Sequence, residues 1–182
     1  MFFEKQVKDL MIPISDYAVT SPEKTLKDAV LEMRKIYCEV ETGSCTEAGH
    51  RTSMVLDSDG KLVGILDFQS ILKVLIPEIA GRLSEKLAAL SVSVAFAEAD
   101  AADLDEARAG FKKRVLKNTE TKVAAIMLKI KGKIDCDASL LDALKMMHRN
   151  KITVIPVFEK DKIIGVLRDS DLFLAIASVL TE

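Results

Sequence analysis

The sequence lacks the features that mark membrane-spanning, secreted and nucleic-acid-binding proteins. No apolar stretch approaches the roughly 20 residues that span a bilayer. Charged side chains appear at Glu4 and Lys5, too early for a signal peptide. Three cysteines in 182 residues are too few for a disulfide framework. The formal net charge of −2 gives no reason to expect a nucleic-acid or membrane surface. We therefore expect a cytoplasmic protein with reduced cysteines.

Sequence patterns of catalysis are missing as well. The chain has no Walker-type phosphate loop, no HExxH metalloprotease pattern and no nucleophile elbow. His148 follows two methionines on a predicted helix and has no obvious nucleophile partner in the sequence. With 49% apolar and 30% charged residues, the composition is that of an ordinary globular protein. The sequence therefore favours a protein that is not an enzyme.

What the sequence does contain is an ordered internal repeat. Three segments of the first half return in the same order in the second half. They are residues 7–11 with 123–127, residues 25–29 with 139–143, and residues 61–66 with 162–167. Any one of these matches could arise by chance, but three matches in the same order hardly could. The sequence therefore predicts a duplicated unit of about 60 residues.

Each repeat is predicted to form a strand, a helix, a hairpin of two strands and a second helix. Thr25 and Ser139 each precede an apolar helical face and have an aspartate three residues later, the pattern of a helix N-cap. In the first hairpin, Gly60 supplies the positive φ that a tight turn needs. Because each unit alone is small, we expect the two sheets to pack face to face. This packing creates two related clefts between the units.

We therefore expect a first unit over residues 1–75, a helical insertion over residues 76–120 and a second unit over residues 121–182. The first unit carries an extended loop over residues 38–50, whose cysteines and histidine do not have the spacing of a common zinc site. The insertion is rich in alanine and is predicted to contribute to self-association, as one helix or several. Its apolar residues follow a heptad-like seam, formed by Leu83, Leu87, Leu90, Val94, Ala97, Ala101, Leu104, Phe111 and Val115.

The two hairpins resemble those of the CBS-domain family. The family pattern of apolar residues and an acidic residue, then a turn and Gly-Ile-Val, appears twice. It is found at residues 54–57 with 64–66, and at residues 156–159 with 165–167. The resemblance implies an α+β fold in which two pseudo-twofold-related CBS units pack through their sheets, with the helical insertion between them. Such tandem pairs, called Bateman modules, commonly bind adenosine derivatives between the units and often form disc-like dimers.

The resemblance also implies where a ligand lies. The family's signature places an aspartate six residues after the hairpin glycine, where its carboxylate can accept hydrogen bonds from both hydroxyls of a ribose. In the second unit this aspartate is Asp171, preceded by Ser170, and Arg168 replaces a hydroxyl residue. Arg168 could hold a phosphate more strongly than a hydroxyl would, or it could fold onto Asp171 and close the site. Without a ligand, Asp171 could serve as a helix N-cap.

The first unit is expected to contribute lining residues to the cleft of Asp171. By the resemblance, these lining residues are Val19, Thr20, Arg51, Thr52 and Ser53. Without a ligand, they are ordinary strand and loop residues. In the first unit, the signature instead has Ser70 at the aspartate position and Asp67 at the hydroxyl position. We expect that half-site to be degenerate, because the charge of Asp67 opposes a phosphate tail.

The resemblance therefore implies a regulatory module that senses an adenosine-containing ligand, of the AMP, ADP, ATP or S-adenosylmethionine type, in one inter-unit cleft. No cofactor is required and no metal site is expected. We expect a homodimer that signals to an unidentified protein partner by conformational change, with no nucleic-acid or membrane partner. The alternative is a ligand-free dimerisation or protein-interaction scaffold with degenerate nucleotide sites.

Overall fold

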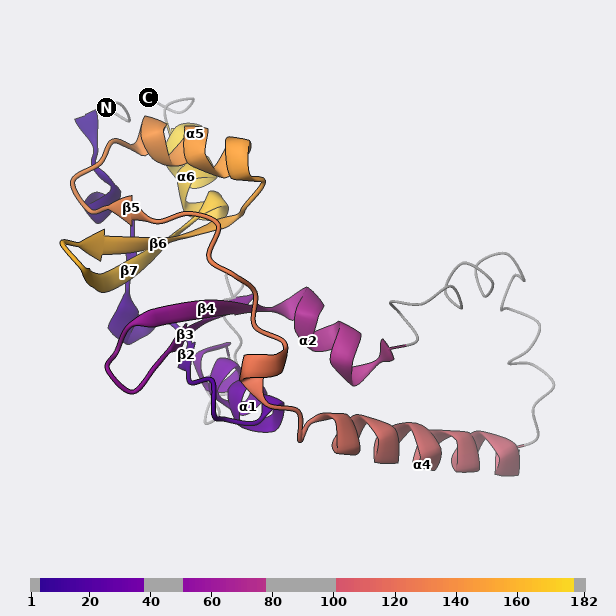
Figure 1. The fold of residues 1–182 in the computed structure, drawn as a ribbon. Helices are drawn as coiled ribbons and strands as arrows, with labels where there is room; N and C mark the ends of the chain where they lie inside the picture. Colours follow the sequence, from indigo (N-terminus) through magenta and orange to yellow (C-terminus); the bar gives the residue numbers. More distant parts are fainter. Residues whose placement is uncertain (1–3, 38–50, 78–100, 179–182) are drawn as a thin grey trace.

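The computed structural model describes residues 4–37, 51–77 and 101–178. Two sheets pack face to face at the centre of the molecule, and helices cover their outer sides (Figure 1). Each sheet is built mainly from one of the two predicted repeats. The α+β architecture of two units packed through their sheets is therefore confirmed.

The first repeat forms a three-stranded sheet of order β2-β3-β4. Its elements are β2 (Val19–Thr20), α1 (Leu26–Tyr37), β3 (Thr52–Leu56), β4 (Leu62–Asp67) and α2 (Phe68–Leu75). Strand β2 pairs with β3 in parallel, whereas β3 and β4 form the predicted antiparallel hairpin. Gly60 in its turn takes a φ of +75°, as predicted.

The second repeat forms a sheet of order β1-β7-β6-β5, to which the first half contributes one strand. Its elements are β5 (Ile134–Asp135), α5 (Leu140–Asn150), β6 (Val154–Glu159), β7 (Lys162–Arg168) and α6 (Asp169–Ala177). The added strand, β1 (Ile12–Pro13), pairs antiparallel with β7. The two repeats therefore share the predicted order of elements but exchange a segment.

Both predicted helix starts are confirmed. The Asp28 N–H donates to Thr25 Oγ1 at 3.2 Å, and the Asp142 N–H donates to Ser139 Oγ at 3.1 Å. The Thr25 hydroxyl and N–H in turn donate to the Asp28 carboxylate, which holds the pKa of that group below its ordinary value. Because these hydrogen bonds satisfy amides that have no partner within the helix, they define where α1 and α5 begin.

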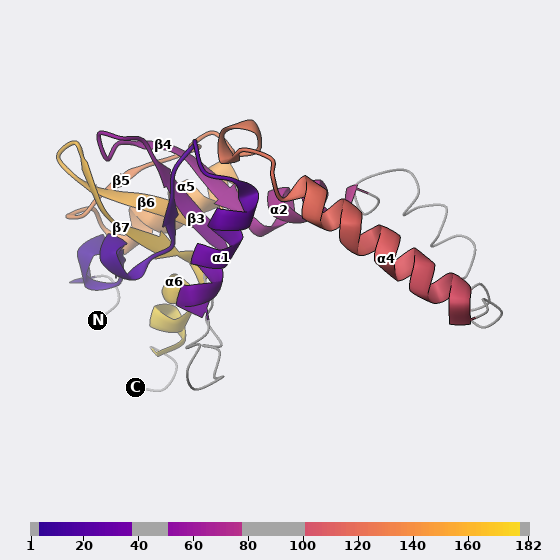
Figure 2. The ribbon, with the colours of Figure 1, turned by 90° about the horizontal axis from the view of Figure 1, so that it is seen from below.

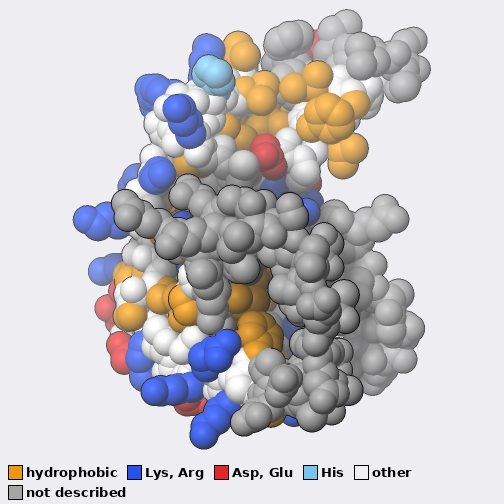
Figure 3. Space-filling view, turned by 90° about the vertical axis from the view of Figure 1, so that its right-hand side faces the viewer, with side chains coloured by type: hydrophobic (Ala, Val, Ile, Leu, Met, Phe, Trp, Pro, Cys, Tyr) orange, Lys and Arg blue, Asp and Glu red, His pale blue; other side chains and the backbone are white. Residues whose placement is uncertain are grey.

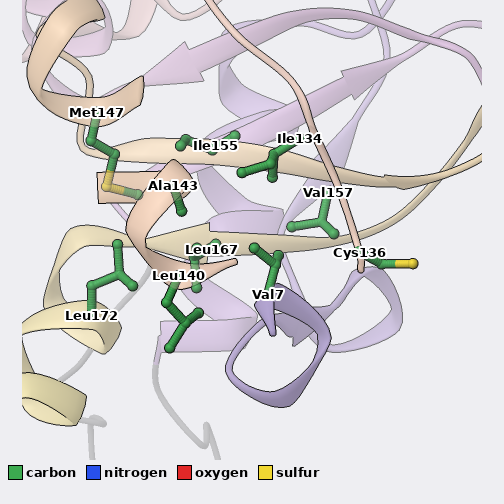
Figure 4. Close-up of a cluster of buried hydrophobic side chains, with 10 residues drawn as sticks. All are labelled: Val7, Ile134, Cys136, Leu140, Ala143, Met147, Ile155, Val157, Leu167 and Leu172. Carbon is green, nitrogen blue, oxygen red and sulfur yellow. The ribbon is translucent and has the colours of Figure 1, made fainter. Parts of the chain in front are cut away.

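The opening segments of the two repeats cross over and pack on opposite units. In η2 (Val7–Asp9), Val7 is fully buried in the core of the second unit, where Figure 4 shows it beneath the sheet. Its N–H donates to the carbonyl of Ala138 at 2.9 Å. In η5 (Val123–Ala125), Val123 is fully buried in the core of the first unit, and its N–H donates to the carbonyl of Lys24 at 3.0 Å. Each unit is therefore completed by the other's opening segment.

This exchange explains the glycine in each hairpin motif. Ile12 lies against β7 and Leu128 lies against β4, each paired antiparallel. A Cβ at Gly165 would lie 2.7 Å from the carbonyl oxygen of Ile12, and one at Gly64 would lie 3.2 Å from that of Leu128. The glycines therefore leave room for the backbone of the other unit.

A third core lies between the two sheets. Tyr17, Met54, Ile163 and Val166 are buried there, with Met54 and Val166 fully excluded from solvent. The two units therefore share apolar surface through their sheets, as expected for units too small to be stable alone.

Helix α4 (Ala101–Asn118) extends away from the two units (Figures 1 and 2). Its C-terminal end lies beside α2, where Asn118 Nδ2 donates to the carbonyl of Leu75 at 3.5 Å. Phe111, a member of the predicted seam, is 41% exposed. Seam residues 83–97 and the extended loop 38–50 lie outside the described residues. Among the described helices, none has both the length and the apolar character that a membrane crossing requires.

Candidate ligand site between the two units

A cavity of about 410 Å³ lies between the two units, and we call it the open cleft. The first unit contributes Thr52 at the start of β3, Ile65 and Asp67 on β4, and Gln69 in the first turn of α2. The second unit contributes two segments. Their lining residues are Leu128, Lys129, Lys131, Gly132, Lys151, Ile152, Thr153 and Val154. The open cleft therefore occupies the first half-site, whose signature has Asp67 and Ser70.

The open cleft has apolar walls and a positively charged rim. Ile65, Leu128, Ile152 and Val154 supply aliphatic surface from both units. The charged lining residues are Lys129, Lys131, Lys151 and Asp67. Three lysines against one carboxylate leave a surplus of positive charge, so the cleft suits a ligand with an apolar ring and an anionic group.

Asp67 has a structural task in this cleft. It is the N-cap of α2, and its Oδ1 accepts the N–H of Ser70 at 2.7 Å. The prediction that this half-site is degenerate rests on Ser70 at the aspartate position and on the charge of Asp67. In the structure, three lysines of the other repeat line the same cavity as Asp67.

The segment 128–132 forms one lip of the cleft, and hydrogen bonds to both units hold it in place. Leu128 and Ile65 exchange backbone hydrogen bonds of 2.7 and 3.0 Å across the interface. Asn150 Nδ2, at the end of α5, donates to the carbonyl of Lys131 at 2.9 Å. A Cβ at Gly132 would lie 3.2 Å from that Nδ2, so the glycine allows the lip to lie close to α5.

The equivalent cleft at Asp171 is occupied by side chains of the protein itself. The Arg168 guanidinium donates from Nε to Asp171 Oδ2 at 2.8 Å and from Nη2 to Oδ1 at 2.5 Å. The two side chains are 15% and 14% exposed, respectively. Of the two alternatives for Arg168, the structure shows the one in which it folds onto Asp171. The hydrogen bonds that Arg168 donates to this carboxylate raise the pKa of the guanidinium above its ordinary value.

Asp171 is not itself the N-cap of α6. That position belongs to Arg168, and Asp171 lies three residues later, where its carboxylate accepts the Arg168 N–H at 3.3 Å. Ser170 is exposed in the first turn, and its N–H donates to Asp169 Oδ1 at 2.7 Å. The carboxylate of Asp171 thus stabilises both the start of the helix and the guanidinium beside it.

Sequence reasoning missed Tyr17, which lies next to this ion pair. Tyr17 is 2% exposed, and its hydroxyl forms a 2.5 Å hydrogen bond with the hydroxyl of Thr52. Burial raises its pKa to about 12, opposed by the hydrogen bond and by the charge of Arg168. The available signal was a difference in length: Thr20 and Ile134 are equivalent in the two sheets, and the path from Ile12 to Thr20 is two residues longer than the path from Leu128 to Ile134. The extra length includes η3 (Ile14–Asp16), which directly precedes Tyr17.

Strand alternation separates the residues predicted to line the cleft of Asp171. Thr52 lines the open cleft, while its hydroxyl bonds to Tyr17 beside the Arg168–Asp171 pair, and Val19 packs against the core between the sheets. Thr20 and Ser53 are buried and face the first unit's own core by alternation; neither hydroxyl has a hydrogen-bond partner within the described residues. Arg51 is exposed just before β3. The structure therefore distributes this set over four environments.

One group of potential metal-binding side chains occurs within the described residues, at Asp135, Cys136 and Asp137. Asp137 forms an ion pair with Lys8 at 2.6 Å, and the Lys8 N–H donates to the carbonyl of Cys136. Burial raises the pKa of the Cys136 thiol above its ordinary value. The group therefore serves to hold the N-terminal segment on the second unit.

Comparison with known families bears directly on this architecture. Residues 7–77 and 123–178 each match the model of the CBS domain. The chain belongs to the CBS-domain family. The two matched regions coincide with the two repeats, so this is a tandem CBS pair. A search of the curated proteins finds no match to the chain.

Several solved structures share the fold of this CBS pair. A CBS domain-containing protein of unknown function from Bacillus anthracis has a TM-score of 0.62 at 18% identity, covering 97% of this chain and 96% of that one. CBSX2 of Arabidopsis thaliana, solved in complex with AMP, has a TM-score of 0.58 at 17% identity, covering 96% and 97%. Protein MJ1004 from Methanocaldococcus jannaschii has a TM-score of 0.59 at 15% identity, covering 96% of this chain. This chain spans 60% of the length of MJ1004.

Proposed function

We propose that this CBS pair is a regulatory module that binds an adenosine-containing ligand in the open cleft. The main support for this proposal is the cleft itself, which lies between the units and combines aliphatic walls with a lysine rim. Its volume of about 410 Å³ falls within the range of small-molecule sites, roughly 300–1,000 Å³. Support also comes from CBSX2, a protein of the same fold that was solved with AMP.

The lining residues suit the separate parts of such a ligand. Ile65 and Ile152 offer apolar surface from opposite units for a purine ring. Asp67 and Gln69 carry acceptors for sugar hydroxyls, and Asp67 uses Oδ1 for the Ser70 N–H. The lysine ammonium groups attract a phosphate. A ligand held by both units would stabilise their present arrangement relative to any other.

The signal would reach α4 along two routes. The lip 128–132 continues N-terminally through η5 to the C-terminal end of α4. Asp67 caps the start of α2, whose other end accepts the hydrogen bond from Asn118 of α4. Because both walls of the cleft connect to the projecting helix, a ligand that moves either wall changes the pose of α4. The output is then another protein, or a second copy of this chain.

We also propose that the module forms a homodimer. Helix α6 carries three apolar side chains on its surface: Phe173, Leu174 and Ile176 are 69%, 66% and 40% exposed. Figure 3 shows apolar side chains on the outer surface of the second unit, at the top of that view. Apolar side chains of this size gain free energy when a partner covers them.

The predicted site around Asp171 stays a second candidate. Its residues are Asp171, Arg168, Ser170, Val19, Thr20, Arg51, Thr52 and Ser53. A ligand there would have to displace Arg168 from Asp171. The alternative of a ligand-free interaction scaffold is favoured by the same ion pair.

Matched tryptophan substitutions separate these possibilities. Thr153 lines the open cleft, and Arg51 is its counterpart in the other repeat, since each supplies a carbonyl to the first residue of the helix after its hairpin. Both side chains are exposed, so either change should preserve the fold. In a thermal-shift titration with AMP, ATP and S-adenosylmethionine, we expect Thr153→Trp to abolish ligand stabilisation and Arg51→Trp to retain it. The opposite result would place the ligand at Asp171, and no shift in the unmodified protein would favour the scaffold.

A further inference from the structure

The three rim lysines reach the open cleft from two separate segments. Lys129 and Lys131 belong to the lip, and Lys151 follows the last residue of α5. All three are exposed, and among the described residues none forms an ion pair with a carboxylate. Three cationic groups that face one cleft raise the local concentration of anions and favour multiply charged ones.

Lys151 occupies an unusual backbone position. Its φ and ψ are both 51°, the left-handed conformation that ends α5, and its N–H donates to the carbonyl of Met147. Glycine or asparagine is the common residue there, because a Cβ is strained in this conformation. A lysine at this position places a positive charge on the rim at a cost in backbone strain.

The other cleft provides an internal comparison. Ile12 is the counterpart of Leu128, so the positions equivalent to the lip lysines hold Pro13 and Ser15. Among the described residues of that cleft, Arg168 is held by Asp171. The lip lysines therefore belong to the open cleft, and the repeat as such does not require them.

We propose that the open cleft selects among adenosine-containing ligands by the charge of the tail. It prefers di- and triphosphates to AMP, and it disfavours S-adenosylmethionine, whose sulfonium and ammonium groups the rim lysines repel. Lys129, Lys131 and Lys151 are the specificity-determining residues. This inference rests on the proposed function, because it names the ligand class of the same cleft.

Isothermal titration of the full chain with adenosine, AMP, ADP, ATP and S-adenosylmethionine tests the inference. We expect affinity to rise from adenosine through AMP to ADP and ATP, by about tenfold between AMP and ATP, consistent with one added charge-assisted contact. S-adenosylmethionine should bind more weakly than AMP. The triple variant Lys129→Gln, Lys131→Gln, Lys151→Gln should bind adenosine as before and lose this ranking.

A charge-matched control uses three exposed lysines of α4 in the variant Lys112→Gln, Lys113→Gln, Lys117→Gln. This control should keep the ranking, since it changes net charge by the same amount away from the cleft. Equal affinities for AMP, ATP and S-adenosylmethionine would overturn the inference and leave the proposed function intact. A rim variant that kept the ranking would also overturn the inference alone. Failure of every adenosine compound to bind would overturn both.

Discussion

The Arg168 guanidinium holds both carboxylate oxygens of Asp171, at 2.8 Å and 2.5 Å. The pair lies where family resemblance places a ribose-binding carboxylate, and it leaves that carboxylate already engaged. The counterpart cleft has a serine at the aspartate position, yet it is open and has a lysine rim. The two clefts of this duplicated fold therefore differ in charge and in occupancy, although the hairpins that frame them are alike.

The ion pair gives a first prediction on stability. Asp171→Ala should lower the free energy of unfolding by about 2 kcal/mol, because the largely desolvated charge of Arg168 would lose the carboxylate that holds it. Adding Arg168→Met should recover part of that loss, since the desolvated charge is then removed. Urea denaturation of both single variants and the double variant measures the coupling. Additive losses would contradict the view that the two side chains act as a buried pair.

Tyr17 predicts a specific dependence on pH. At neutral pH, Tyr17→Phe should lower the free energy of unfolding by about 1 kcal/mol, because the hydrogen bond to Thr52 is lost. The folded-state pKa of Tyr17 is raised to about 12 from an ordinary value of 10.0. The stability linked to this shift is present below pH 10 and is lost as pH rises towards 12, because only the unfolded chain ionises easily in that window.

Phenylalanine has no proton to lose, so the order of stability should reverse at about pH 11. By that pH, the ionisation of Tyr17 in the unfolded chain has removed more stability than the hydrogen bond contributed. Denaturation of Tyr17→Phe and the unmodified protein at several pH values from 8 to 12 measures this reversal. The unmodified chain serves as the control for lysine titration, which both proteins share. A constant difference across the range would show that Tyr17 ionises as freely in the folded state as in the unfolded chain.

The hairpin glycines predict a graded response. Gly165→Ala should cost about 2 kcal/mol, because the new Cβ meets the Ile12 carbonyl and the backbone must shift. Gly64→Ala should cost less, since the Leu128 carbonyl is farther away, at 3.2 Å. Gly110→Ala is the control. Its Cβ would meet nothing closer than 3.9 Å, so inside α4 it should stabilise the helix by roughly 0.5–1 kcal/mol. Thermal and urea denaturation should follow this order, and equal effects would contradict the close approach.

The exchanged opening segments predict where stability is lost. Val7→Ala should cost about 1–2 kcal/mol and should reduce amide protection most in β7 and α5, although residue 7 lies in the first repeat. Val123→Ala should reduce protection most in β3 and α1. Native-state hydrogen exchange measures both patterns. Loss of protection confined to the mutated residue's own repeat would contradict the exchange.

The elements were predictable because each repeat carries local signals of its own. Thr25 and Ser139 mark helix starts through hydrogen bonds made within three residues, and Gly60 marks a turn through its own φ. The exchange of opening segments was not predictable in this way. Val7 and Val123 would be buried apolar residues in either unit, and a pattern along the chain does not specify which unit covers them.

The site was harder to predict for the same reason. The resemblance identified Asp171, but it could not decide whether Arg168 would face a ligand or the carboxylate. The rim of the open cleft combines Lys131 and Lys151 with Asp67, residues of two repeats that no local pattern connects. The positive charge of this rim can be recognised only once the fold brings these residues together.

The most direct test of the central claim is a crystal structure of the protein grown with ATP. We expect the nucleotide in the open cleft, with its base between Ile65 and Ile152, its phosphates near the rim lysines, and the Arg168–Asp171 pair intact. A nucleotide bound to Asp171, with Arg168 displaced, would contradict this account.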